Sequence, residues 1–180
     1  MEDPKHLKQF LDEKVKQYNR PSFIERDPIS IPHAFTKKQD VEIAGLFAAT
    51  LAWGNRTTII NNCRKLMGWM DNQPHDFIVN HKDTDLKGFI HFAHRTFNAT
   101  DLLYFIELLQ YHYTRHDTLE DAFVPGKTYK EENVEEALIH FHNYFFSIEH
   151  PDRTKKHIAT PARNSACKRI NMFVQVIEAA

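Results

Sequence analysis

The chain has 180 residues, of which 42% are hydrophobic and 12% aromatic, enough to bury the core of a single domain. Its formal net charge is −1, and its two cysteines, which we expect to be buried and reduced, are too few for a zinc ribbon or a four-cysteine iron–sulfur cluster. The longest uncharged apolar run, residues 43–53, is too short to cross a bilayer, and no secretory signal is visible. We therefore expect one domain over residues 1–180, in the cytoplasm, with no membrane partner and no cofactor.

Helical periodicity recurs along almost the whole chain, which has only five glycines and no alternating β-branched run. The fold should therefore be all-α. The first helix is predicted to begin at Pro4 and to end before Pro21, with an apolar residue every three or four positions. After a proline-rich loop, Thr36 and Gln39 form a predicted capping box. The helix that follows is apolar on nearly all sides as far as Leu51, so it should be central.

Gly54 is predicted to end this central helix, and a second helix carrying Ile59, Cys63 and Leu66 begins a few residues later. The two should form a helical hairpin, and all the helices together a compact, orthogonal bundle. Further helices are expected over residues 74–79, 85–92, 101–115, 133–146 and, after a proline-bounded connection, 163–178.

The most unusual charge pattern lies near the C-terminus. Between residues 153 and 169 the chain has three Arg, three Lys and no acid, a local charge of +6. Because phosphate contacts depend on where positive charge is concentrated, this basic tract predicts a polyanion partner despite the net charge.

The turn after the central helix combines a large aromatic side chain with polar groups, in Trp53, Gly54, Asn55 and Arg56. Each has an ordinary structural explanation: core packing for Trp53, a helix stop for Gly54, an N-cap for Asn55 and a solvated charge for Arg56. Together they are what a loop that wedges into nucleic acid requires.

Twelve histidines include pairs at helical spacing, which raises metal binding as an alternative. A metal-dependent phosphohydrolase would use a set of residues comprising His91, His94, His112, His116 and Asp117. Histidines on an aromatic helix surface more often satisfy hydrogen bonds or titrate in solvent. We therefore predict no metal site.

Four blocks of the chain resemble an uncharacterised bacterial family: residues 27–29, 40–56, 94–97 and 153–173. That family is in turn similar, more remotely, to the helix-hairpin-helix DNA glycosylases of the endonuclease III type. The resemblance implies a DNA-glycosylase-like fold, DNA as the partner and a role in base-lesion repair. The region from Phe47 to Leu66 resembles the glycosylase wedge, and residues 165–171 resemble the start of the helix that opens with a lysine.

By this resemblance Lys168 is the predicted catalytic residue, because a lysine amine in a partly desolvated cleft can attack the sugar C1′ of a flipped nucleotide. For binding, we expect the turn and the basic tract to line one concave groove. The nucleic-acid-binding residues predicted in this way are Trp53, Asn55, Arg56, Arg153, Lys155, Lys156, His157, Arg163, Arg169 and Asn171.

The chain departs from the glycosylase pattern in two places. Asn164, Ser165 and Ala166 stand where those enzymes have glycines, and the catalytic aspartate expected downstream of Lys168 lies beyond the last residue. We therefore expect a truncated and catalytically incomplete relative. A third alternative is a noncatalytic helical interaction module whose exposed apolar surface drives association.

Overall fold

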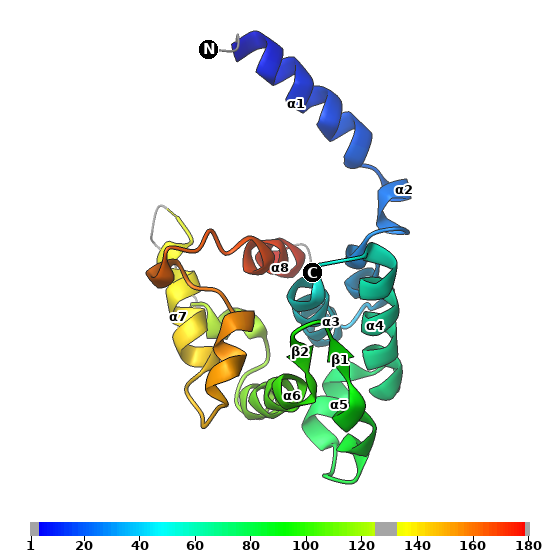
Figure 1. Ribbon diagram of the computed structural model, residues 1–180, viewed down its shortest axis with the longest axis vertical. Coiled ribbons are helices and arrows are strands. Elements are labelled where there is room, and N and C mark those ends of the chain that lie inside the picture. Colours follow the sequence, from blue (N-terminus) through cyan, green and yellow to red (C-terminus); the bar gives the residue numbers. More distant parts are fainter. Residues whose placement is uncertain (1–3, 125–132, 179–180) are drawn as a thin grey trace.

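The computed structural model describes residues 4–124 and 133–178, and over these ranges the fold is all-α, as predicted (Figure 1). The only strands described, β1 and β2, form one antiparallel hairpin that pairs Ala93 with Asn98 and His94 with Phe97. The elements in chain order are α1 (Pro4–Tyr18), α2 (Pro21–Ile24), η1 (Pro28–Ser30), η2 (Pro32–Ala34), α3 (Lys38–Leu51), α4 (Arg56–Trp69), α5 (Pro74–Asn80), η3 (Asp85–His91), β1 (Ala93–His94), β2 (Phe97–Asn98), α6 (Ala99–Tyr113), η4 (Leu119–Ala122), α7 (Glu135–Phe145), η5 (Asp152–His157), η6 (Pro161–Arg163) and α8 (Lys168–Glu178), where η marks a 3-10 helix.

Helix α3 is the centre of the body, which confirms its predicted position. Every residue from Glu42 to Leu51 is buried, and the helix packs against α8. The close approach depends on Gly45, because a Cβ there would lie 2.9 Å from Val176 Cγ1. Two helices without a side chain between them can pack closer than the usual interaxial distance of about 8–10 Å.

The predicted start of α3 is wrong in detail. Lys37 is the N-cap, and no side chain caps the helix, so the expected box of Thr36 and Gln39 does not form. The Gln39 side chain instead donates a hydrogen bond to the carbonyl oxygen of Asp117, 3.0 Å away. A partner 78 residues away in sequence is invisible to a local capping rule.

The helical hairpin of α3 and α4 is confirmed. Gly54 has a φ of +113°, a left-handed value that favours glycine, and it turns the chain between the two helices. Asn55 is the N-cap of α4, and its side-chain oxygen accepts a hydrogen bond from Thr58 N at 3.2 Å. The ordinary structural explanations for Gly54 and Asn55 therefore both hold.

Three further expectations need correction. The segment from Pro21 to Phe35 is not an irregular loop but contains α2, η1 and η2. The predicted helix over residues 85–92 is the 3-10 helix η3, followed by the unpredicted β1–β2 hairpin. The last helix begins at Lys168 rather than at 163, because Asn164 and Cys167 adopt left-handed φ values of 56° and 49° that interrupt a helix.

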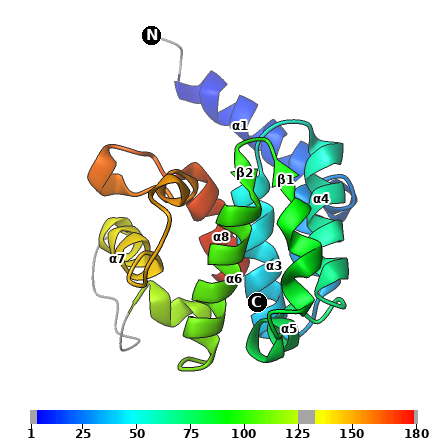
Figure 2. The ribbon, with the colours of Figure 1, turned by 60° about the horizontal axis from the view of Figure 1, so that its bottom comes forward.

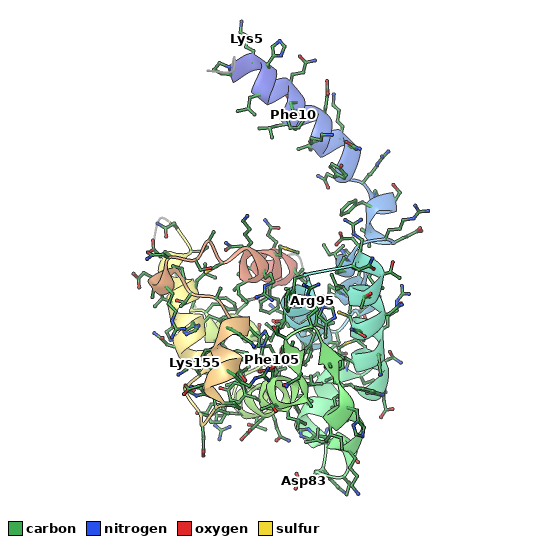
Figure 3. The ribbon with its side chains drawn as sticks, viewed as in Figure 1. Lys5, Phe10, Asp83, Arg95, Phe105 and Lys155 are labelled. Atoms are coloured by element: carbon green, nitrogen blue, oxygen red, sulfur yellow. The ribbon has the colours of Figure 1, made fainter. Side chains whose placement is uncertain are left out.

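An aromatic cluster fills the body around Phe105, which is fully buried on α6 (Figure 3). Its ring lies 4.7 Å from that of Phe145 and 5.2 Å from that of Phe97. Cys63 and Cys167 are buried and free, as expected, and burial raises the pKa of the Cys63 thiol to about 12. At neutral pH the Cys63 thiol is therefore protonated and unreactive.

Helix α1 projects away from this body (Figure 1). It has the predicted bounds, but none of its residues is buried. Across the two ranges that the structure describes, no helix has the length and apolarity needed to span a bilayer.

Candidate nucleic-acid interface

The first half of the basic tract is tied to a buried carboxylate. Asp101 is 0% exposed, and its Oδ2 accepts a hydrogen bond from Arg153 Nη1 at 2.7 Å. Its Oδ1 accepts from Thr154 Oγ1 at 2.8 Å, and His157 Nε2 lies 3.3 Å from Oδ2. Asp101 also closes the capping box of α6 by accepting from Asn98 N at 3.0 Å. One side chain therefore joins the tract, the β1–β2 hairpin and α6.

Arg153 extends this connection to the tip of the hairpin. Its Nη2 donates to the carbonyl oxygen of Thr96 at 3.0 Å, and its Nη1 also donates to Asn98 Oδ1. His157 is 2% exposed, and its ring packs edge-on against Phe97. Both residues were predicted to bind nucleic acid. His157 is buried, and the exposed Arg153 already donates to Thr96 and Asn98, so both side chains help to position the hairpin.

The second half of the tract meets the end of α3. Arg169 Nη1 donates a hydrogen bond to the carbonyl oxygen of Thr50 at 2.7 Å, although the two residues are 119 positions apart. Thr50 lies in the last turn of α3, three residues before Trp53. The tract and the turn therefore lie on the same side of the molecule, and Figure 2 shows the β1–β2 hairpin and the start of α8 toward one end of the body.

At this end of the body, the Trp53 side chain packs against two residues of the β1–β2 hairpin. The guanidinium carbon of Arg95 lies 4.5 Å from the centre of the Trp53 ring, and His94 packs edge-on at 6.3 Å. His94 Nε2 also lies 3.3 Å from the Trp53 carbonyl oxygen. A Cβ on Gly54 would lie 3.1 Å from Arg95 Nη1, so glycine leaves room for the stack. Arg95 is exposed and forms the outer layer of a Trp–Arg pair.

Arg95 is the interface residue that the sequence prediction missed. It sits in the two-residue turn of the hairpin with a φ of 57° (Figure 3). A signal was available, because the block from His94 to Phe97 carries the resemblance. The resemblance did not predict that Arg95 lies over Trp53, because the β1–β2 hairpin and the turn at Trp53 are about 40 residues apart in the chain.

Arg56 lies beside the interface but has partners of its own. Its Nη2 is 3.8 Å from Asp27 Oδ2, and its guanidinium lies over the ring of Phe23 at 5.7 Å. Asn55 is used as the cap of α4. Asn171 donates from Nδ2 to the carbonyl oxygen of Ala166 at 3.1 Å. All three stay predicted contacts with nucleic acid, and each side chain already has a role within the protein.

Among the basic residues of the tract and the β1–β2 hairpin, four exposed side chains have no acidic partner within the part of the chain that the structure describes: Arg95, Lys156, Arg163 and Lys168. Lys155 differs from these four, because its Nζ lies 3.0 Å from Asp152 Oδ1. Figure 3 shows Lys155 toward α7, apart from Arg95. The free cations are therefore Lys156, Arg163 and Lys168 of the tract together with Arg95 of the hairpin.

The start of α8 forms one wall of a hollow of about 310 Å³, lined by Ser165, Lys168 and Arg169 among others. Cys167 N donates to Ser165 Oγ at 3.2 Å, and the left-handed Asn164 and Cys167 make the turns for which glycine is normally used. The first N–H groups of a helix have no partner within it and attract anions. Lys168 itself is exposed, so the described residues do not form the desolvated cleft that we expected around it.

The histidines do not assemble a metal centre over residues 4–124 and 133–178. There, no three His, Cys, Asp or Glu side chains are close enough together to hold an ion. His112 Nδ1 lies 2.8 Å from Tyr144 Oη and Nε2 lies 2.8 Å from the Thr118 carbonyl oxygen. His94 Nδ1 lies 2.9 Å from Asn62 Nδ2. Of the side chains considered for a phosphohydrolase, His94 and His112 are thus engaged in internal hydrogen bonds.

Buried histidines predict acid sensitivity. Burial lowers the pKa of His112, His142 and His157 below the usual 6.5, so folding favours their neutral forms. The unfolded chain therefore binds more protons below about pH 6.5, and their stabilising contribution is lost as the pH falls. We expect the urea midpoint to decrease between about pH 7.5 and pH 5.5. The substitution His142→Gln should reduce this dependence, whereas an unchanged slope would contradict the assignment.

The geometry defines an all-α domain with a cationic end face built from a helical hairpin, a β-hairpin and a helix N-terminus. A family described as "Protein of unknown function (DUF2400)" matches residues 27–177, and the chain belongs to that family. Neither a curated protein nor a solved structure matches the chain.

Proposed function

We propose that this protein is a cytoplasmic, DNA-glycosylase-like domain that binds DNA at this end face and acts on damaged or abasic sites. The observation that carries the proposal is the hydrogen bond from Arg169 to the Thr50 carbonyl oxygen, which joins the basic tract to the turn at Trp53. It brings together two features that sequence reasoning had assigned to one groove.

In this proposal the side chains divide by role. Lys156, Arg163 and Lys168 are exposed and contact phosphate, while Arg95 approaches the base stack over Trp53. Arg153 and Arg169 hold the hairpin and α8 in register through backbone carbonyl groups. A rigid supporting layer of this kind reduces the ordering cost when DNA binds.

Affinity should fall steeply with salt. Three phosphate contacts give a slope of log K against log salt of roughly −3, at about 0.9 per contact. We expect Lys168→Ala and Arg163→Ala each to reduce the slope by about 1, measured by fluorescence anisotropy on a labelled duplex with an abasic site. Lys82→Ala is the matched control, because Lys82 precedes Asp83 at the opposite end of the body (Figure 3).

The enzymatic part of the proposal depends on Lys168 as nucleophile. Its amine would attack C1′ of an abasic sugar and form an imine with loss of water, which borohydride reduces to a stable amine. Lys168 is exposed in the free protein, so the proposal requires bound DNA to desolvate its amine, and a covalent protein–DNA adduct is then expected for the wild type. Lys168→Arg keeps the charge for phosphate binding but removes the nucleophile, so it should bind DNA and give no adduct.

Two outcomes would contradict these assignments separately. DNA affinity that is unchanged between about 50 and 200 mM salt would rule out the proposed phosphate contacts, and with them the proposed interface. Strong DNA binding by the wild type without a covalent adduct would support a DNA-binding domain and rule out Lys168 as the nucleophile.

A further inference from the structure

Helix α1 carries an apolar stripe that the described residues leave uncovered. Its five members, between 49% and 57% exposed, are Leu7, Phe10, Leu11, Val15 and Tyr18. Since a large aromatic side chain has about 150–250 Å² of surface, the stripe exposes on the order of 500 Å². An exposed patch of this size on one side of an otherwise polar helix is typical of an interaction site.

A second apolar surface lies on the body. The segment from η1 to η2, α3 and α8 enclose a groove of about 360 Å³. Pro32, Phe35, Met172 and Val176 form its walls, and small residues such as Ala48 line it between them. The groove lies within the range that matches the family, whereas α1 precedes that range.

The corner between α1 and α2 keeps the helix pointing away from the groove. Asn19 N donates to the Val15 carbonyl oxygen at 2.8 Å, and Arg20 Nε donates to the Gln17 carbonyl oxygen at 2.8 Å. The rings of Tyr18 and Phe23 pack edge to face at 5.7 Å across the corner. Only two residues separate the helices, so α1 cannot fold back onto its own body without breaking these contacts.

We propose that α1 inserts its stripe into the groove of a second copy of this chain, so that two copies exchange α1 in a symmetric dimer. A short, ordered hinge between a helix and its domain favours such exchange over folding back. Two stripes of about 500 Å² each, together with the groove surfaces that they cover, would bury on the order of 1,200–1,500 Å² in total, within the range of stable protein interfaces.

The molar mass in solution tests the exchange. At about 10 μM, where an interface of this size is associated, light scattering after size exclusion should give a dimer for the wild type. Leu11→Lys on the stripe and Met172→Lys on the groove wall should both give monomers. Gln9→Lys is the matched control, because Gln9 lies on the opposite face of α1. Met172 is 47% exposed, so its substitution leaves the core intact, which circular dichroism verifies.

Each other outcome overturns the proposal. A monomeric wild type whose hydrodynamic radius increases on Leu11→Lys would show that α1 covers its own groove. A dimer that Leu11→Lys dissociates but Met172→Lys does not would mean that two α1 helices pair with each other. A dimer that survives both substitutions would exclude the stripe and the groove alike.

Discussion

Replacing Asp101 with alanine is expected to destabilise the protein by about 2–4 kcal/mol, because it takes a fully buried acceptor away from a buried hydroxyl and from the cap of α6. The carboxylate is fully buried and accepts from Arg153 at 2.7 Å, from Thr154 at 2.8 Å and from Asn98 N at 3.0 Å. Alanine takes the acceptor away from all three donors at once. Thr154 is left with an unpaired buried hydroxyl, and α6 loses half of its capping box.

Urea denaturation monitored by circular dichroism measures this loss. Asp152→Ala is the matched control on the same tract, because that carboxylate is exposed and pairs with Lys155 at the surface. It should change the free energy of unfolding only slightly, because exposed ion pairs contribute little. A loss of the same small size for Asp101→Ala would show that the buried network does not hold the hairpin.

The helices of this fold are predictable from sequence because their signals are local. Apolar residues three or four apart place α1, α3 and α4 within a few residues of their observed bounds, and Asn55 is recognisable as a cap from its position after Gly54. The β1–β2 hairpin was missed because two residues per strand carry no periodicity. The helix η3 was given the wrong type, since a seven-residue 3-10 segment and one α-helical turn show similar spacing.

The candidate interface was only partly predictable, for a different reason. Counting charges treats the basic tract as one surface. In the structure its side chains fall into two groups, those hydrogen-bonded within the protein and those left exposed. Arg153 and Arg169 reach carbonyl groups 57 and 119 residues away, whereas Lys156 and Lys168 remain exposed. Long-range hydrogen bonds of this kind leave no mark on local composition, and the same limit hides Arg95 over Trp53.

Glu42 is expected to be the other position of large effect, because it is an acidic residue in the second turn of α3 with 0% exposure. Its carboxylate accepts from Tyr113 Oη at 2.8 Å, Thr118 Oγ1 at 2.5 Å and Leu119 N at 3.0 Å. Glu42→Ala leaves three buried donors without an acceptor, and at about 1–3 kcal/mol for each we expect a loss of at least about 3 kcal/mol. Exposed Glu107 on α6 supplies the control Glu107→Ala, expected within about 0.5 kcal/mol.

The contribution of Glu42 to stability is expected to depend on pH with the opposite sign to that of the buried histidines. Burial raises the pKa of Glu42 above its ordinary 4.5, although its hydrogen bonds with Thr118, Leu119 and Tyr113 oppose the shift. The folded state therefore holds the proton more tightly, and the contribution of Glu42 to stability falls as the pH rises from about 4.5 through the raised value. Glu42→Gln cannot titrate. Its free energy of unfolding relative to wild type, from urea titrations at several pH values, should rise over that window, and a constant difference would show that Glu42 has its ordinary pKa.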